Sequence, residues 1–275
     1  MTTIELPALE TDYAVPLNRI AEFREQGHTI LRGVASSDEI AVYQPLIREA
    51  AFRHNRETRP IEEREDIIEK ALLQIWNLWT VDEATRRFVF ARRFAQVAAD
   101  LMGVPSVRIY HDQALFKESG AGRTPWHQDQ FFWPLDSDKM VTMWMPLVDV
   151  SAEIGTMSFV SGSQKFGYLG DFPISDETEA QFETMIAERG LDVHTHGKAA
   201  AGDATFHSGW TLHMAPSNPT GTLREVMTVI YFADGMHVAE PENDAQRIDL
   251  DRWLPGLAPG DLAASELNPL VLDRS

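Results

Sequence analysis

Hydrophobic and polar positions in the first third of the chain recur at the spacing of amphipathic helices. Residues 36–57 begin with Ser36 and Glu39 at the spacing of a capping box, and apolar residues then fall on one helical face. Residues 80–103 begin with a similar stretch, TVDE, and end at Gly103, a typical residue after a helix. A short strand, HTILRGV, is predicted before the first helix. The pattern therefore predicts a helical N-terminal layer.

From residue 106 the pattern changes to short runs rich in β-branched and aromatic residues, separated by Gly, Pro, Ser and Asp. Five runs are predicted as strands: 106–118, 140–150, 156–162, 203–209 and 224–234. Strands that follow helices in this way indicate a mainly β fold, an antiparallel sandwich or barrel with flanking helices. The predicted organisation is one domain over 1–275, with a helical layer at about 1–105, a strand core at about 106–235, and proline-rich loops and turns at 236–275.

Composition narrows the class of protein. The chain has 275 residues, 44% hydrophobic and 24% charged, which suits a soluble globular enzyme, and no run of about 18 apolar residues is present to span a membrane. The formal net charge of −18 disfavours nucleic acid and anionic membranes as partners, because a negative surface repels phosphate groups. Cysteine is absent and the N-terminus does not resemble a secretory signal, so the expected location is the cytoplasm.

The stretch TPWHQDQFFWP places a histidine and a carboxylate among aromatic residues. In a strand, His127 and Asp129 would point to the same side and Gln128 outward. His213 is the best candidate for a third ligand, and two histidines with one carboxylate on one face of an ion would leave the other face open. That arrangement suits iron(II), although zinc is an alternative. Ordinary packing is the alternative for each histidine.

Arg224 strengthens the hypothesis of a functional site. It stands at the head of the apolar strand REVMTVIYF, where a buried guanidinium needs an anionic partner. A small dicarboxylate cosubstrate would supply one, and an internal salt bridge to Glu225 or Asp203 is the alternative. His207 lies six residues before His213 on the same segment, so either histidine could be the third ligand on this reasoning alone.

These elements together resemble the phytanoyl-CoA dioxygenase-like branch of the iron(II)/2-oxoglutarate oxygenases. The resemblance runs from LLQIWNLW to VIYFADG and includes HDQALFKESGAGRTPWHQD, MVTMWMPLVDVSAEIGTMSFVSGSQKFG and GDATFHSGWTLHMAPSNPTGTLRE. The HxD pair, the distal histidine, the asparagine and the arginine occur in the family's order.

The resemblance implies a double-stranded β-helix (jelly-roll, cupin-like) core with flanking helices. It also implies that His127, Asp129 and His213 bind iron(II), that Arg224 holds the distal carboxylate of 2-oxoglutarate, and that dioxygen is the oxidant. The family's spacing favours His213 over His207 as the ligand. Related halogenating enzymes lack the carboxylate, so the presence of Asp129 favours oxygenation.

Three further residues match positions that contact the cosubstrate in the family: Trp144, Gln113 and Thr124, for which ordinary packing is an equal alternative. The residue two beyond the distal histidine is often serine in the family and is Ala215 here, so one polar contact to 2-oxoglutarate is expected to be missing. The family's GSH is GSQ in this chain, ending at Gln164, which we expect to be structural.

The implied reaction is hydroxylation of an unactivated C–H bond, with release of succinate and carbon dioxide. The implied substrate is a small or medium-sized, partly apolar metabolite. Aromatic residues would form an apolar vestibule around the iron, drawn from Phe131, Phe132, Trp133, Trp126 and Trp210. The alternatives are a cupin-type metalloenzyme that does not use 2-oxoglutarate, and a binding protein that has lost turnover.

Overall fold

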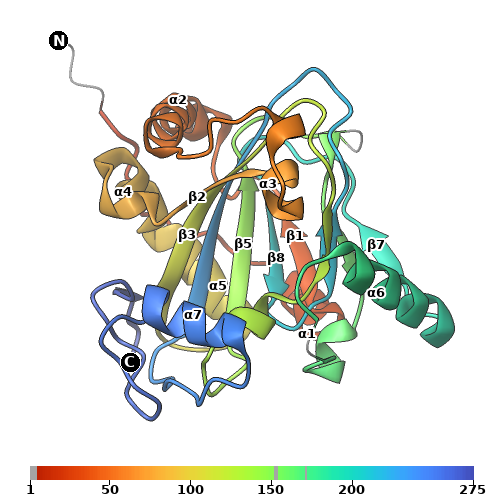
Figure 1. Cartoon of the computed structure of the whole chain (residues 1–275). Helices are drawn as coiled ribbons and strands as arrows, with labels where there is room; N and C mark the ends of the chain where they lie inside the picture. The colour runs from red at the N-terminus through yellow and green to blue at the C-terminus, as the bar shows by residue number, and fades with distance from the viewer. Residues whose placement is uncertain (1–4, 152–153, 171) are drawn as a thin grey trace.

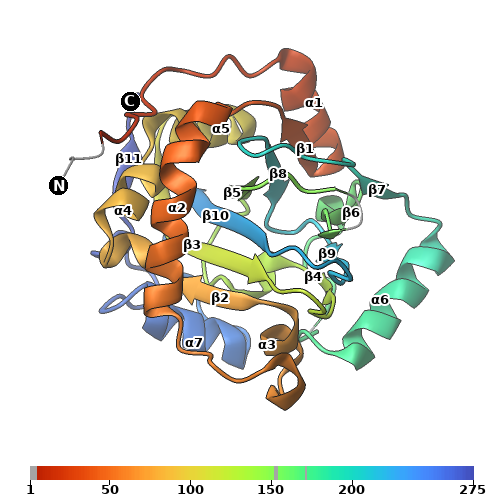
Figure 2. The same ribbon diagram turned by 90° about the horizontal axis from the view of Figure 1, so that it is seen from above.

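The computed structural model describes residues 5–151, 154–170 and 172–275. Its centre is a large antiparallel sheet that faces a smaller one (Figures 1 and 2). The large sheet has the order β1 (His28–Leu31), β8 (Ala204–Ser208), β5 (Met140–Pro146), β10 (Arg224–Ala233), β3 (Val107–Lys117) and β11 (Leu270–Leu272), and β2 (Leu73–Trp76) also pairs with β3. The small sheet has the order β4 (Thr124–His127), β9 (His213–Ala215), β6 (Ser158–Val160) and β7 (Val193–Thr195).

Helices cover the outer face of the large sheet (Figure 2). They are α1 (Leu17–Gln26), α2 (Ser37–His54), α4 (Glu83–Val89) and α5 (Arg92–Met102). α5 packs on β3, β5, β10 and β11, and the main hydrophobic core fills the space between these helices and the sheet. Two facing sheets with helices on one side confirm the predicted fold class. No helix in the described part of the chain is both long and apolar enough to cross a bilayer.

The N-terminal helices form largely where the hydrophobic pattern predicts them. Ser36 accepts a hydrogen bond from the Glu39 backbone, and the Glu39 carboxylate accepts one from the Ser36 backbone, which completes the predicted capping box. The second prediction is wrong in detail, because Asp82, not the preceding threonine, caps α4. The helix is also interrupted near residue 91 and begins again as α5. This helix ends at Gly103 as predicted, where φ is +70°.

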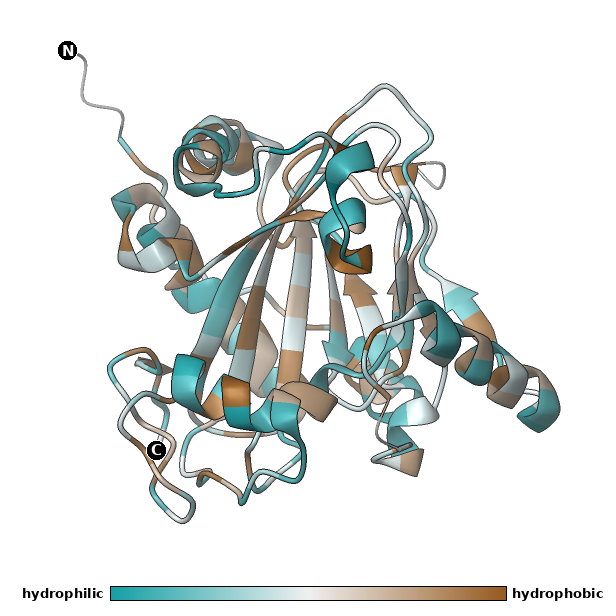
Figure 3. Ribbon diagram, in the orientation of Figure 1, coloured by the Kyte–Doolittle hydropathy of each residue, from teal (hydrophilic) through white to brown (hydrophobic). Residues whose placement is uncertain are grey.

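Alternation along the central strands sorts side chains between the hydrophobic core and the interior between the sheets. Figure 3 shows apolar and more polar residues alternating along β5. On β10, Met227 and Val229 belong to the main core beneath the helices, whereas Thr228 and Ile230 line the interior. On β3, His111 and Gln113 line the same interior, and the pairing with β10 shifts register just beyond His111, between Ile230 and Tyr231.

The prediction of loops and turns at 236–275 is wrong for two segments. α7 (Asp244–Trp253) begins at Asn243, whose side chain caps the Gln246 backbone, and β11 extends the large sheet. Pro241 and Pro255 flank α7 and do not interrupt it, so the proline content hid a helix. Neither α1 nor α6 (Asp176–Arg189) was predicted as a separate helix, and α3 (Ile67–Ala71) lies within the predicted helical layer. α3 and α7 lie near the inner side of the sheet (Figure 1).

Candidate active site

The predicted ligand triad converges at the junction of the two sheets. His127 is the last residue of β4, His213 is the first residue of β9, and the two are antiparallel register partners. Asp129 begins the short 3-10 helix that follows β4. One ligand atom from each of the three side chains lies within 4.8 Å of the other two. The strand expected to hold both His127 and Asp129 thus ends at His127, and the turn after it brings the carboxylate back toward the imidazoles.

The prediction that Gln128 points outward is wrong. Its side chain is buried and donates hydrogen bonds to the carbonyl oxygens of Gly167 and Trp210. These bonds anchor the turn between His127 and Asp129, so the intervening residue has a structural task.

Both histidines present a free Nε2 to the centre of the triad. The Nδ1 of His127 donates to the carbonyl of Pro125 at 2.7 Å, and the Nδ1 of His213 donates to the carbonyl of Thr211 at 2.9 Å. Each Nε2 lies 3.7 Å from Oδ1 of Asp129. Backbone acceptors on Nδ1 fix the tautomer that leaves the Nε2 lone pair for a metal ion.

The electrostatics agree with a cation site. Burial lowers the pKa of His127 and of His213, so both rings are neutral at neutral pH. Burial alone would raise the pKa of Asp129, but the surrounding histidines outweigh it and lower that pKa, so the carboxylate is ionised. Two neutral imidazoles and one carboxylate are the charge states in which these groups bind a divalent metal.

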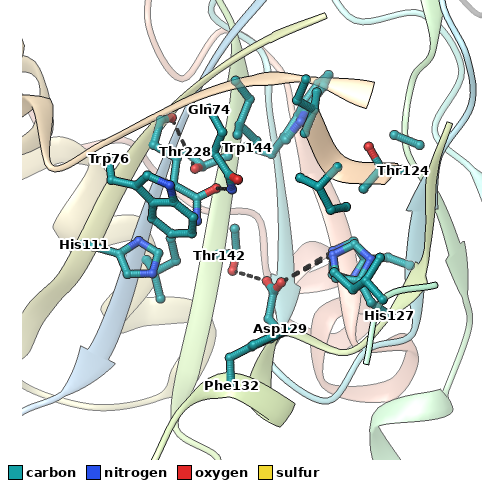
Figure 4. A pocket seen from close by; sticks show the side chains of 18 of the residues that line it. Gln74, Trp76, His111, Thr124, His127, Asp129, Phe132, Thr142, Trp144 and Thr228 are labelled. Atoms are coloured by element: carbon teal, nitrogen blue, oxygen red, sulfur yellow. Dashed lines mark hydrogen bonds and ion pairs between the residues drawn. The ribbon is translucent and has the colours of Figure 1, made fainter. Parts of the chain in front are cut away.

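His207, the alternative third ligand, occupies a different position. Its Nε2 lies 3.1 Å from Oδ2 of Asp129, on the carboxylate oxygen that Thr142 also contacts through Oγ1 at 2.7 Å. Figure 4 shows Thr142 and the histidine cluster on two sides of Asp129. The geometry therefore favours His213 as the ligand and makes His207 a neighbour of the carboxylate.

A cavity of about 440 Å³ lies beside the triad. Residues of β2, β3, β5 and β10 on the large sheet and of β4 and β9 on the small sheet line it, with α3 and α7 contributing to its rim. Arg224 lines it as well. A volume in this range suits a small-molecule site.

Arg224 is a buried cation without a carboxylate partner among the described residues. It is 1% exposed; Nη1 donates to the carbonyl of Gly155 at 2.7 Å, and Nε has no hydrogen-bond partner in the described structure. Burial lowers its pKa to about 9, so it remains protonated at neutral pH. The alternative salt bridges are absent, because Glu225 pairs with Arg48 and Asp203 pairs with Arg32.

The three predicted cosubstrate contacts all line the same cavity. Trp144 lies under the Arg224 guanidinium, with 5.5 Å from Cζ to a ring centroid. Thr124 is buried, and its hydroxyl has no hydrogen-bond partner in the described part of the chain. Gln113 accepts a hydrogen bond from Gln74 at 3.2 Å. The cavity is thus lined by polar groups, and two of them, Nε of Arg224 and the Thr124 hydroxyl, are unsatisfied among the described residues.

The predicted aromatic vestibule is right only in part. Phe132 and Trp133 line the cavity. Trp126 instead packs in a small cluster near α6, and Phe131 and Trp210 pack around Tyr168 outside it. The turn that carries Asp129 explains the difference, because it directs successive aromatic side chains to different sides.

Several lining residues were missed from the sequence: Trp76, His111, Thr142, Thr228, Asp249 and Arg252. For two of them a signal existed. Thr142 lies two residues before Trp144 on β5, and His111 lies two residues before Gln113 on β3, so each shares a face with a predicted site residue. The sequence alone could not predict that Asp249 and Arg252 of α7 line the cavity, because only the folded chain places α7 beside the sheet.

The donor set fits a divalent iron ion. Two nitrogens and one oxygen converge from one side, and the cavity lies on the other, which is the open facial arrangement of non-heme iron oxygenases. The unsatisfied Nε of Arg224 and the unsatisfied hydroxyl of Thr124, which line the same cavity, also fit an anionic, oxygen-rich molecule.

Comparison with known proteins decides the family. The family model described as phytanoyl-CoA dioxygenase (PhyH) matches residues 23–226, more than half of the chain. The chain belongs to the phytanoyl-CoA dioxygenase family. A curated relative, the probable alpha-ketoglutarate-dependent hypophosphite dioxygenase of Stutzerimonas stutzeri, is 23% identical over 223 residues, which are 77% of each chain.

Solved structures agree with this family assignment. SnoN, the epimerase from nogalamycin biosynthesis solved with Fe³⁺, alpha-ketoglutarate and nogalamycin RO, has a TM-score of 0.75 and 26% identity over 93% of this chain and 98% of its own. The carbocyclase SnoK, with a TM-score of 0.75 and 24% identity over 94% of this chain and 96% of its own, supports the fold alone. EctD from S. alaskensis, at 17% identity and a TM-score of 0.67 over 86% and 83%, supports the fold alone.

This PhyH-family protein is therefore an iron(II)- and 2-oxoglutarate-dependent dioxygenase. The predicted fold class, enzyme class and cofactors are confirmed. The alternatives of a cupin-type enzyme that does not use 2-oxoglutarate, and of a binding protein without turnover, are set aside by the same comparisons.

Proposed function

We propose that this enzyme hydroxylates an unactivated C–H bond of a small or medium-sized, partly apolar metabolite. In this proposal His127, Asp129 and His213 hold iron(II), and Arg224 holds the distal carboxylate of 2-oxoglutarate. The observation that carries it is the combination of the convergent triad and a buried, unpaired guanidinium on one cavity.

Held by His127, Asp129 and His213, iron(II) would supply the oxidising chemistry together with 2-oxoglutarate and dioxygen, with succinate and carbon dioxide as the coproducts. The residues of the chain bind and orient 2-oxoglutarate and the substrate. Arg224 fixes one end of the diacid by a charge-assisted hydrogen bond, and Trp144 supports the guanidinium from below. The free hydroxyl of Thr124 offers a further donor. Ala215 lines the same cavity and offers no side-chain polar group, so Thr124 is the better candidate for that contact.

The remaining part of the cavity suits the proposed substrate class. Trp76, Phe132, Trp133 and Ile230 supply apolar surface, which excludes water from the reacting centre. The relatives' names point to different substrates, including hypophosphite and a nogalamycin compound, so none of these is carried over.

Binding of the cosubstrate is the first test. Anaerobic addition of iron(II) and then 2-oxoglutarate should produce a weak visible charge-transfer band. Arg224→Ala should raise the 2-oxoglutarate concentration needed for the band, and His213→Ala should abolish it. A normal band in His213→Ala together with its loss in His207→Ala would overturn the ligand assignment.

The reaction outcome needs a separate test, because two of the similar structures are a carbocyclase and an epimerase. A metabolite library should be screened for substrates that stimulate succinate formation, and each product should be analysed by mass spectrometry under isotopically labelled dioxygen. Hydroxylation predicts the gain of one labelled oxygen atom. Loss of two hydrogens, or an unchanged composition with inverted stereochemistry, would contradict hydroxylation and leave the dioxygenase class intact.

A further inference from the structure

The two oxygens of the Asp129 carboxylate have different surroundings. Oδ1 faces the Nε2 atoms of His127 and His213, each at 3.7 Å. Oδ2 contacts two other side chains, Oγ1 of Thr142 at 2.7 Å and Nε2 of His207 at 3.1 Å. One oxygen is thus directed to the metal position and the other is held by the protein.

The two residues that hold Oδ2 lie on adjacent central strands of the large sheet. Thr142 on β5 and His207 on β8 are directly opposed register partners, so their side chains stand side by side on one face. Both strands lie inside the sheet, with β1 on one flank and β10 on the other. The carboxylate comes from the turn after β4 and meets this pair from the opposite sheet.

The hydrogen-bond roles of the pair are determined by the carboxylate. A carboxylate oxygen accepts hydrogen bonds, so the Thr142 hydroxyl donates to Oδ2 and His207 presents its N–H to the same oxygen through Nε2. The Nδ1 of His207 is then an acceptor, and it is buried without a hydrogen-bond partner in the described structure. A proton on that Nδ1 would be an unsatisfied buried donor, which disfavours the other tautomer.

We propose that Thr142 and His207 are positioning residues that hold Asp129 as a ligand through Oδ1 alone. A carboxylate whose second oxygen is free can rotate and chelate the ion through both oxygens, which takes up a coordination position. With Oδ2 held, the positions facing the cavity stay open for 2-oxoglutarate and dioxygen. This inference rests on the metal site of the proposed function and adds two residues to it.

Paired substitutions at Thr142 separate the hydrogen bond from the shape of the side chain. Thr142→Val removes the hydroxyl and keeps the volume, whereas Thr142→Ser keeps the hydroxyl. Thr205→Val is a matched control, because Thr205 is buried on β8 two residues from His207 and its hydroxyl has no partner among the described residues. Iron(II) affinity is measured anaerobically by competition with a fluorescent chelator, and the charge-transfer band is then titrated with 2-oxoglutarate.

We expect Thr142→Val to weaken iron(II) binding by about 10- to 100-fold, the usual effect of losing such a partner of a metal ligand. The 2-oxoglutarate titration should shift to higher concentration and the band should move, while Thr142→Ser and Thr205→Val stay near wild type. His207→Leu should behave like Thr142→Val. His207→Gln, whose amide nitrogen reaches about as far as the imidazole Nε2, should recover most of the affinity.

The proposal is overturned if Thr142→Val and His207→Leu bind iron(II) as wild type does, or if Thr142→Ser is as impaired as Thr142→Val. Thermal unfolding of the metal-free variants provides the check on folding, and a loss of stability with unchanged iron affinity and band position would mean a structural role only. Failure of the proposed function looks different, because the wild-type protein itself would then give no charge-transfer band.

Discussion

Replacing Arg224 with methionine should raise the stability of the ligand-free protein and lower its affinity for 2-oxoglutarate. Burial lowers the pKa of Arg224 from 12.5 to about 9. At about 1.4 kcal/mol per pKa unit, the buried charge destabilises the ligand-free protein by at most about 5 kcal/mol. The variant loses the hydrogen bond to the Gly155 carbonyl, which costs about 1–3 kcal/mol. We therefore expect the free energy of unfolding of the ligand-free variant to rise by at most about 2–4 kcal/mol.

The same change should weaken binding of the diacid. Truncating one partner of a buried, hydrogen-bonded charge pair costs about 2–5 kcal/mol. At about 1.4 kcal/mol for each factor of ten, the dissociation constant for 2-oxoglutarate should increase by between about 30-fold and about 4,000-fold. If removal of the cation stabilises the ligand-free protein and weakens ligand binding, the charge of Arg224 serves the ligand and not the fold.

The assay combines chemical denaturation of the ligand-free protein with anaerobic titration of the iron(II) form by 2-oxoglutarate. Arg48→Met is the matched control, because Arg48 is half-exposed and already paired with Glu225 at 3.1 Å. It should leave 2-oxoglutarate binding unchanged and slightly lower the unfolding free energy. The reasoning is refuted if Arg224→Met binds 2-oxoglutarate as tightly as wild type, or if it unfolds more easily than wild type without ligand.

Three further predictions concern stability and are checked by chemical denaturation. Lys117 is fully buried, and burial together with a neighbouring arginine lowers its pKa from 10.5 to about 6. Between about pH 6 and pH 10.5 the unfolded chain therefore binds more protons than the folded one, and this lysine makes the unfolding free energy rise with pH. Lys117→Met should flatten that rise. An unchanged slope would contradict the lowered pKa of Lys117. Gly202→Ala should destabilise the fold by more than about 1 kcal/mol, because the backbone has φ +87° and a Cβ would collide with the carbonyl oxygen of Ala35; wild-type stability would disprove the clash. Ser36→Ala should cost about 1 kcal/mol by removing the cap of α2, and Ser37→Ala, at an exposed position one residue later, should cost less; equal losses would argue against the cap.

Local rules in the sequence determined most of the strands and the main helices. Runs rich in β-branched and aromatic residues, bounded by Gly, Pro, Ser and Asp, located β3, β5, β6, β8 and β10, because such side chains pack well on the pleated surface of a sheet. The capping box at Ser36 located the start of α2 for a similarly local reason. Where the local signals were ambiguous the prediction failed, as in the proline-rich region that contains α7, since flanking prolines resemble interrupting ones until the chain is folded.

The candidate site residues were also named from the sequence. Residue type indicated the ligand pair and Arg224, and the family resemblance supplied the preference for His213 over His207 and the three further cosubstrate contacts. The arrangement of these residues was not available from the sequence. The turn after His127 broke the assumed strand, so that Asp129 reaches the imidazoles from a 3-10 helix and not from a shared strand face. The different positions of His207 and His213 depend on which strand each joins, and sequence spacing carries no information about that.

Tertiary structure alone decided three properties of the centre: the absence of a carboxylate beside Arg224 among the described residues, the asymmetry of the two Asp129 oxygens, and the part of α7 in the cavity rim. Each is a relation between groups brought together by the pairing of strands far apart in the chain. Burial and hydrogen-bond partners are properties of such a neighbourhood, whereas hydrophobic period and capping are properties of a few consecutive residues. That difference is why the elements could be predicted and the contacts had to be observed.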